Sequence, residues 1–202
     1  MKRLQRIFIH MTFGFVITML MVCGAGYTVN AANAGVTDLQ SNITYKSFDL
    51  DGDHKKDKIR LKRNTKNGML QASIKINGKV LYKMPKDYRL RAGIRIITLQ
   101  NGRNFIYFWS EGAQLEADDV ILQYRNGKIK EVVDFQEMKE LQKYNGGFFL
   151  YKSYWDNAIT VFHNSLKIKL NTCNWSVGTT VLELSYKYKN GTLQMNNRGR
   201  IY

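Results

Sequence analysis

Three Asn-Gly pairs, at residues 77–78, 126–127 and 190–191, each separate two stretches in which apolar and polar residues alternate. The segments read LQASIKINGKVLYKM, DVILQYRNGKIKEVVDF and VLELSYKYKNGTLQM. Asn and Gly tolerate the positive φ angles of a type I′ turn, which joins two antiparallel strands through only two residues. The pattern therefore predicts three β-hairpins and an all-β fold.

The spacing of these pairs indicates that one structural unit occurs more than once. They are 49 and then 64 residues apart, near the period expected when four strands form one unit. A further candidate hairpin, IRIITLQNGRNFIYFW, turns at Asn101-Gly102, so the middle unit would have strands near 94–99, 105–109, 120–124 and 129–135. We expect about three antiparallel four-stranded, blade-like units in a propeller-like meander or a sandwich, because a closed propeller commonly needs four or more blades. Only FQEMKELQKY, at 135–144, has helical spacing.

The first 34 residues have the order of a secretory signal peptide. Basic residues at the start are followed by a mostly apolar run over 13–22 and then by small residues up to Ala34. A membrane-spanning helix needs about 20 apolar residues, and Gly24, Gly26 and Asn30 interrupt this run. We therefore predict cleavage near Ala34, a secreted or cell-surface location, and a mature chain that does not span the membrane.

The chain that remains, residues 35–202, is long enough for a single all-β domain with a sizeable core. Removal of the leader takes three of the 31 basic residues and none of the 16 acidic ones, so the formal net charge falls from +15 to +12. It also leaves Cys173 as the only cysteine, which excludes an intrachain disulfide. Stability must then come from the core, from a bound metal, or from both.

An acidic segment stands out against this positive charge. FDLDGDHKKDKIRL, at 48–61, places four of the chain's 16 acidic residues within nine positions: Asp49, Asp51, Asp53 and Asp57. Carboxylates that alternate on a tightly turning backbone converge and repel one another, and a hard cation with oxygen ligands removes that conflict. Gly52 would supply the backbone freedom for the turn. The segment therefore predicts a cation site.

The EF-hand loop is excluded, because it requires glycine at position 6 and glutamate at position 12, where this chain has His54 and Arg60. The stretch resembles the calcium loop of FG-GAP and VCBS-type repeats, found in integrin-like propellers and in many secreted bacterial proteins. Residues 49–57 match its pattern Asp-x-Asp-Gly-Asp-x-x-x-Asp in full, and the resemblance extends, as one four-stranded unit, to about 48–84. It implies one Ca²⁺ site made by the side chains of Asp49, Asp51, Asp53 and Asp57 and the backbone carbonyl of Lys55.

Alternatives to this site remain open. An Asp-rich turn without metal, balanced by neighbouring lysines, would have the same composition. The segments 116–120 and 154–157 of the later units do not repeat the acidic loop, so a propeller with several calcium sites is not expected. The site is expected to be structural, holding a hairpin of a disulfide-free domain.

Catalytic motifs are sparse. The sequence has no Gly-x-Ser-x-Gly elbow and no His-Glu-x-x-His pair. A glycosidase needs only two carboxylates across a cleft, and four acids offer them: Glu111, Glu116, Asp118 and Asp119. A solvated loop explains these acids more simply, and we predict a protein that is not an enzyme. His163 is expected at a strand end, as a surface or partly packed imidazole rather than a catalytic one. The tryptophans and tyrosines are expected mainly in the core rather than on a sugar-binding platform.

The remaining signal is charge. Lys and Arg are scattered through RLKRNTKN, KDYRLRAGIR and NNRGRIY, so the surface field should attract polyanions. No nucleic-acid-binding motif is present, and specific binding to nucleic acid is not expected. The interpretation is an exported, calcium-binding, non-catalytic module for an anionic cell-wall polymer or a polysaccharide. Alternatives are a carbohydrate-active hydrolase and a structural subunit that pairs through strand edges.

Overall fold

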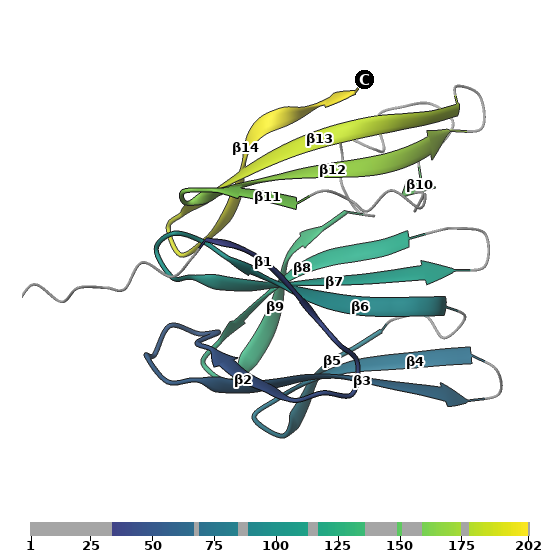
Figure 1. Ribbon diagram of the computed structural model, residues 1–202. Helices are drawn as coiled ribbons and strands as arrows, with labels where there is room; N and C mark the ends of the chain where they lie inside the picture. Colours follow the sequence, from purple (N-terminus) through teal and green to yellow (C-terminus); the bar gives the residue numbers. More distant parts are fainter. Residues whose placement is uncertain are drawn as a thin grey trace, which may run out of the picture. The chain divides into compact units, whose positions relative to one another are not determined.

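The computed structural model (Figure 1) describes residues 34–66, 69–84, 89–112, 117–135, 149–150, 159–174 and 178–201. Every regular element in these ranges is a β-strand, which confirms the all-β prediction. The strands are β1 (Gly35–Leu39), β2 (Tyr45–Phe48), β3 (Asp57–Lys66), β4 (Met69–Ile76), β5 (Lys79–Lys83), β6 (Arg89–Thr98), β7 (Asn104–Gly112), β8 (Ala117–Arg125), β9 (Lys128–Asp134), β10 (Phe149–Leu150), β11 (Ile159–Phe162), β12 (Ser165–Asn174), β13 (Gly178–Lys189) and β14 (Thr192–Ile201).

Nine strands form one antiparallel sheet, and seven of them follow the order β2-β3-β4-β6-β7-β8-β9. The other two lie off this path: β5 pairs with β4, and β1 pairs with β6 from Gly35↔Thr98 to Leu39↔Ile94. The link between β4 and β6 is the single pair Leu70↔Arg89. The strands expected for the first and middle units therefore lie in one continuous sheet rather than in two separate ones.

The last five strands form a second antiparallel sheet in the order β10-β12-β13-β14, with β11 paired to β12. Its longest ladder joins β12 to β13, from Ser165↔Lys187 to Asn174↔Gly178. A β-bulge interrupts the pairing of β13 with β14 near Ser185. These strands contain the third hairpin that the sequence predicts.

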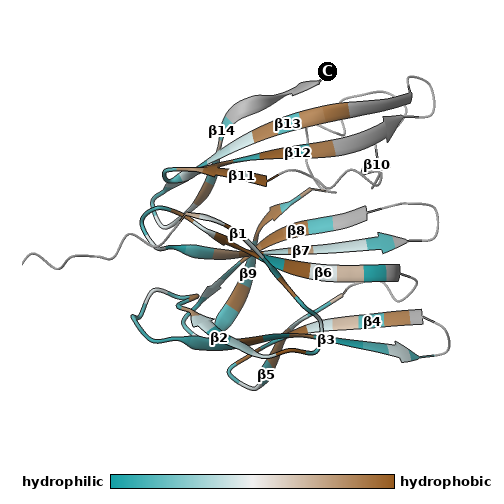
Figure 2. Ribbon diagram, viewed as in Figure 1, coloured by the Kyte–Doolittle hydropathy of each residue, from teal (hydrophilic) through white to brown (hydrophobic). Residues whose placement is uncertain are grey.

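Strands β6, β7 and β8 have buried residues on both faces, because the two hydrophobic cores lie on opposite sides of them. On β7, Phe105 and Tyr107 belong to one core with Leu166 and Leu184 of the second sheet. The alternate residues, with Phe108 among them, belong to the other core, which also contains Ile59 and Ile74 of β3 and β4. The apolar run on β7 is thus the signature of a strand covered on both faces. Figure 2 shows hydrophobic and hydrophilic segments alternating along β4, which has one face covered.

The three predicted Asn-Gly turns are confirmed, since both residues of each pair have positive φ: 50° and 85° at 77–78, 52° and 74° at 126–127, and 53° and 82° at 190–191. Positive φ at both central positions defines the type I′ turn. The fourth candidate, Asn101-Gly102, also joins two paired strands, β6 and β7, but there only Gly102 has positive φ. Its turn is closed by hydrogen bonds between Leu99 and both Gly102 and Arg103.

Other predictions fall outside the described residues. They are the signal peptide, whose residues 1–33 are not described, and the segment at 135–144 with helical spacing, of which only Phe135 is described, as a buried residue after β9. Cys173 lies on β12, opposite Thr179. In the ranges that the structure describes, no helix is long and apolar enough to cross a membrane.

Candidate metal centre

The acidic loop, residues 49–57, connects β2 to β3 and turns sharply. Gly52 and His54 have φ of 79° and 67°, so the chain enters the left-handed region twice within three residues. Leu50 is buried in the core shared by β3, β4 and β6. A buried apolar side chain between two acidic residues anchors the loop to the domain, and it places the neighbouring carboxylates at the edge of the core.

Asp49 organises the backbone of this loop. Its Oδ1 accepts hydrogen bonds from the backbone N–H of Gly52 (2.7 Å) and Asp53 (3.1 Å), and its Oδ2 accepts one from His54 N–H (2.9 Å). Three N–H donors on one carboxylate partly compensate its charge and hold the following residues in a tight turn. The role of Asp49 is therefore conformational as well as electrostatic.

Asp57 is the buried member of the group. Its Oδ2 accepts a hydrogen bond from Leu50 N–H (2.8 Å), and its Oδ1 accepts one from Nδ2 of Asn77 (2.7 Å). Asn77 is the first residue of a predicted Asn-Gly turn, and its Oδ1 accepts a hydrogen bond from Lys58 N–H (2.9 Å). One turn residue thus fixes both the hairpin of β4 and β5 and the end of the acidic loop.

Three carboxylates converge in the loop. One oxygen each from Asp49, Asp51 and Asp57 lie within 4.8 Å of one another. Asp53 is not part of this group; it is exposed, and its Oδ1 accepts a hydrogen bond from the backbone N–H of Lys55 (2.8 Å). The structure therefore brings together three of the four predicted carboxylate ligands, and Lys55 lies in the loop as an exposed residue.

The electrostatics of the group fit a cation. Burial raises the pKa of Asp51 above its ordinary value, and the nearby charges of Asp57, Asp53 and Asp49 raise it further, against a hydrogen bond from Asp53 N–H that lowers it. Burial also raises the pKa of the Tyr124 hydroxyl, against a hydrogen bond with Asn77 that lowers it, and the charges of Asp57, Asp51 and Asp53 raise it further. Each carboxylate oxygen has two acceptor sites, so Oδ2 of Asp49 and both oxygens of Asp57, which accept one hydrogen bond each, can still bind an ion.

The turn between β6 and β7 supports the acidic loop from the side. Nδ2 of Asn104 donates a hydrogen bond to the backbone carbonyl of Asp49 (2.7 Å), and Oδ1 of Asn104 accepts one from the hydroxyl of Thr98 (2.7 Å). Nη1 of Arg103 donates to the backbone carbonyl of Asp51 (3.1 Å). These residues lie some 50 positions from the acidic loop and carry no motif of their own, so the sequence alone does not indicate them.

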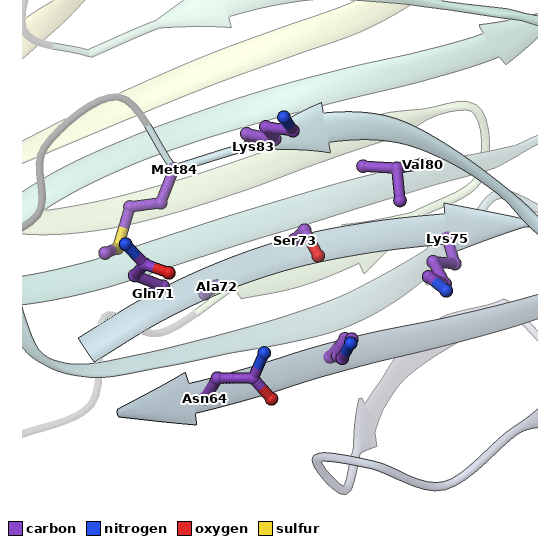
Figure 3. Close-up of a pocket in the computed structure, with 9 residues that line it drawn as sticks. Asn64, Gln71, Ala72, Ser73, Lys75, Val80, Lys83 and Met84 are labelled. Atoms are coloured by element: carbon purple, nitrogen blue, oxygen red, sulfur yellow. The ribbon is translucent and has the colours of Figure 1, made fainter. Parts of the chain in front are cut away.

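A second polar site lies on the face of β3, β4 and β5 that points away from the core (Figure 3). This lysine groove has a volume of about 340 Å³, and its polar lining consists of Lys62, Lys75, Lys83, Asn64, Gln71 and Ser73. The register places Lys62 and Lys83 on either side of Ser73. No carboxylate lines the groove, and within the described ranges no acidic side chain forms an ion pair with its three lysines.

The carboxylates named for the hydrolase alternative are at the end of β7, at the start of β8 and in the segment between them. Asp119 is fully buried and accepts a hydrogen bond from the hydroxyl of Tyr107, so it is inaccessible to an external ligand. Glu111 is half-buried at the end of β7, and Asp118 lies on β8 opposite Ser110. Glu116 falls outside the described residues.

His54 and His163 lie at the surface, and the position of His163 at a strand end agrees with the expectation. The backbone N–H of His54 donates a hydrogen bond to Asp49, and His163 occupies the turn between β11 and β12, where its Nδ1 pairs with Oε1 of Gln100. Trp109 is half-buried against the core between the two sheets. The other residues of the possible aromatic platform, among them Trp155 and Trp175, are not described.

Comparison of the chain with protein-family models, with curated proteins and with solved structures finds no match. The resemblance of residues 49–57 to an FG-GAP or VCBS-type calcium loop therefore stays a prediction that rests on the loop itself.

Proposed function

We propose that this protein is an exported, non-catalytic, calcium-stabilised β-module that binds an anionic polymer of the cell envelope in the lysine groove. The observation that carries the proposal is the composition of that groove. Its described lining has three lysines, three amide or hydroxyl side chains and the apolar residues Ala72, Val80 and Met84, and it includes no carboxylate. Cations that lack an internal counter-charge attract external anions. Amide and hydroxyl groups between them suit the hydroxyl groups of a sugar or polyol chain.

The groove lies on a rigid support. Its β4 residues Ser73 and Lys75 alternate with Ile74 and Ile76, which are buried in the core. Because successive side chains of a strand point to opposite faces, the burial of the isoleucines holds the polar residues outward. Arg60, opposite Lys75 in the register, adds a fourth cation to this face. The positive charge is thus arranged before any ligand binds, which lowers the cost of ordering side chains on binding.

Calcium would act in the acidic loop, which ends at Asp57, the first residue of β3. Ca²⁺ takes six to eight oxygen ligands in flexible geometry, and the convergence of Asp49, Asp51 and Asp57 supports binding through their carboxylates. The resemblance adds Asp53 and the carbonyl of Lys55. The ion would neutralise the repulsion within the group and hold the loop. Even a site with a dissociation constant of about 10⁻⁴ to 10⁻³ M would be partly filled at extracellular calcium concentrations.

Binding of polymer is tested by calorimetric titration of the purified protein with polygalacturonate and with a poly(glycerol phosphate) chain. The variant Lys62→Gln/Lys83→Gln should weaken binding about tenfold, since two charge contacts of about 0.7 kcal/mol each are lost. The matched control is Lys128→Gln/Lys130→Gln, which removes the same charge from exposed residues of β9 outside the groove. Equal weakening by both variants would place binding on the general surface charge, and absence of binding by the unaltered protein would reject the proposed function.

Calcium binding is tested separately by thermal unfolding with 1 mM calcium and with chelator. A site with a dissociation constant of about 10⁻⁴ M would stabilise the fold by about 1.4 kcal/mol, or about 3 to 6 °C in Tm. Asp51→Ala should remove this shift. An unchanged Tm in the unaltered protein, together with no heat of binding, would reject the calcium site while leaving the lysine groove in place.

The enzyme and subunit alternatives make different predictions. A hydrolase would lose activity on replacement of Glu111, Glu116 or Asp118, and its polymer substrate would shorten during the titration. A subunit that pairs through strand edges would elute as an oligomer on size-exclusion chromatography. In the described topology, β2 and β9 end the larger sheet and β10 and β14 end the smaller one, so these edges are the ones to examine.

A further inference from the structure

A separate polar cavity of about 250 Å³ lies beside the acidic loop, and it shares no residue with the lysine groove. Four segments line it: the loop with Asp51, the turn before β7 with Arg103, the end of β8 with Arg125, and the hairpin of β13 and β14 with Tyr188 and Gly191. It therefore draws on both sheets. Nε2 of Gln123 closes one wall by donating a hydrogen bond to the carbonyl of Gly191 (2.9 Å).

The guanidinium of Arg103 is held in place by the loop. Nη1 donates to the carbonyl of Asp51, and the group covers Gly52 so closely that a Cβ at that position would lie 1.8 Å from Nη1. Glycine at 52 is thus required for the close approach as well as for its positive φ. The remaining N–H groups of the guanidinium stay available, since Arg has five donors in a fixed fork.

Arg125 contributes the second guanidinium. A Cβ at Gly191 would lie 3.4 Å from its Nη1, which places the group beside the β13–β14 turn. In the described ranges, no carboxylate forms an ion pair with Arg125. The cavity therefore has two arginines from different segments, and arginine recognises carboxylate and phosphate through paired hydrogen bonds.

Asp51 is the one acidic residue among the described residues that line the cavity. Its carboxylate also belongs to the three-carboxylate group, so a cation there would neutralise it and leave the two arginines as the dominant charge. This step rests on the proposed calcium site. Tyr188 offers a half-buried ring, packed edge-to-face on Phe105 with centroids 6.0 Å apart, as an apolar wall, and Asn104 and Gln123 add amide groups.

We propose that this arginine cavity binds the carboxylate or phosphate group of a single polyhydroxyl unit, and that calcium in the acidic loop strengthens the binding. The volume, just below the range of roughly 300 to 1,000 Å³ typical of pockets for drug-sized ligands, suits one acidic sugar or one phosphorylated polyol rather than a longer chain. The oxyanion lies between the two guanidinium groups, and the amides and Tyr188 contact the polyol. By linkage, the ligand in turn strengthens calcium binding by the same factor.

The test is calorimetric titration of the purified protein with glucuronate, with sn-glycerol 3-phosphate and with inorganic phosphate, each in calcium and in chelator. Glucuronate or glycerol phosphate should bind, the better of the two identifying the acid group, and should bind at least fivefold more tightly with calcium. Arg125→Gln should weaken this binding at least tenfold. The control Lys66→Gln removes the same charge from an exposed residue at the far end of β3 and should change it less than twofold.

Each contrary result has a distinct meaning. If calcium binds but none of the three anions does, or if Arg125→Gln binds as the unaltered protein does, the arginine cavity is not a ligand site. Equal affinity for phosphate and for both polyol ligands overturns the polyol recognition, and equal anion affinity in calcium and chelator overturns the coupling. If the acidic loop does not bind calcium, titration with calcium gives no heat of binding. If the lysine groove does not bind polymer, only the polymer titration is affected.

Discussion

The acidic loop and the lysine groove both include residues of β3, yet they place their charges in opposite ways. In the loop, Asp49 and Asp57 are crowded together and each accepts hydrogen bonds from groups of the protein itself. In the groove, the lysines are spread over three strands and have no acidic partner in the described ranges. Charge that is satisfied internally supports the local fold, whereas charge left unsatisfied at a surface is available to an external partner.

Asp57→Ala should have the largest effect, and it tests whether the acids of the loop support the fold. Two hydrogen bonds to a buried carboxylate are lost, and the Leu50 N–H remains without its acceptor. We expect a loss of about 2 to 4 kcal/mol in the free energy of unfolding, measured by urea denaturation with chelator present.

Two further variants control this measurement. Asp53→Ala alters an exposed carboxylate of the same loop and should cost less than about 1 kcal/mol. Asp57→Asn keeps one acceptor and should lie between the two. If Asp57→Ala costs no more than Asp53→Ala, the loop does not support the fold in the way its hydrogen bonds indicate.

Gly52→Ala should have the next largest effect. An L-residue at φ of 79° costs about 1 to 2 kcal/mol, and the new Cβ would displace the guanidinium of Arg103, which then loses its bond to Asp51. We expect a total cost of about 2 to 3 kcal/mol by urea denaturation. Gly127→Ala, at φ of 74° with no atom within 4 Å of the new Cβ, should show the backbone cost alone. Equal costs would mean that Arg103 moves aside freely.

Asp51→Asn is expected to act in opposite directions with and without calcium. The fold raises the pKa of Asp51. The contribution of this residue to the free energy of unfolding is therefore fully present below the ordinary pKa of 3.8, and it is lost as the pH rises through the raised pKa. At neutral pH and in chelator, the variant should therefore unfold at a Tm higher by up to about 2 °C. In calcium it should unfold at a lower Tm than the unaltered protein, because a ligand is lost.

The same raised pKa makes calcium binding sensitive to acid. Protons compete with the ion for Asp51, so the affinity for calcium should begin to fall at a higher pH than an ordinary aspartate would allow. Calcium titrations between pH 7 and pH 4 measure this fall. An affinity that stays constant down to pH 4 would show that Asp51 does not bind the ion.

The smallest effect is expected for Lys62→Gln. No described side chain pairs with this lysine, so its neutralisation should change the free energy of unfolding by less than about 0.5 kcal/mol in either direction. The measurement is again urea denaturation, and the control for function is the polymer titration. A large loss of stability would indicate that the groove lysines, like the acids of the loop, serve the fold.

Local features of the fold were predictable because each depends on few neighbouring residues. Asn77-Gly78 forms its turn through backbone preferences alone, and the alternation on β4 places Ile74 inward wherever the sheet lies. The convergence of Asp49, Asp51 and Asp57 was predictable from their spacing around Gly52. The exposed position of Asp53, outside that group, was not, since it depends on the actual path of the loop.

Distant features required the tertiary structure. The pairing of β1 with β6 joins residues about 60 positions apart, and the single pair Leu70↔Arg89 connects the two halves of the large sheet. Asn104, Arg103 and the cavity beside them exist only because the turn before β7 reaches the loop. No short motif encodes such contacts, since each partner alone is an ordinary polar residue.

The sequence by itself determined the strand class, the type I′ turns and a group of carboxylates suited to a cation, because these follow from backbone preference, side-chain alternation and spacing over a few residues. Only the tertiary structure decided that β7 is covered on both faces, that three lysines of neighbouring strands share one groove, and that Arg103 and Arg125 line one cavity. The physical reason is that burial and charge balance depend on which distant segments pack together, and the packing is settled by the whole core at once.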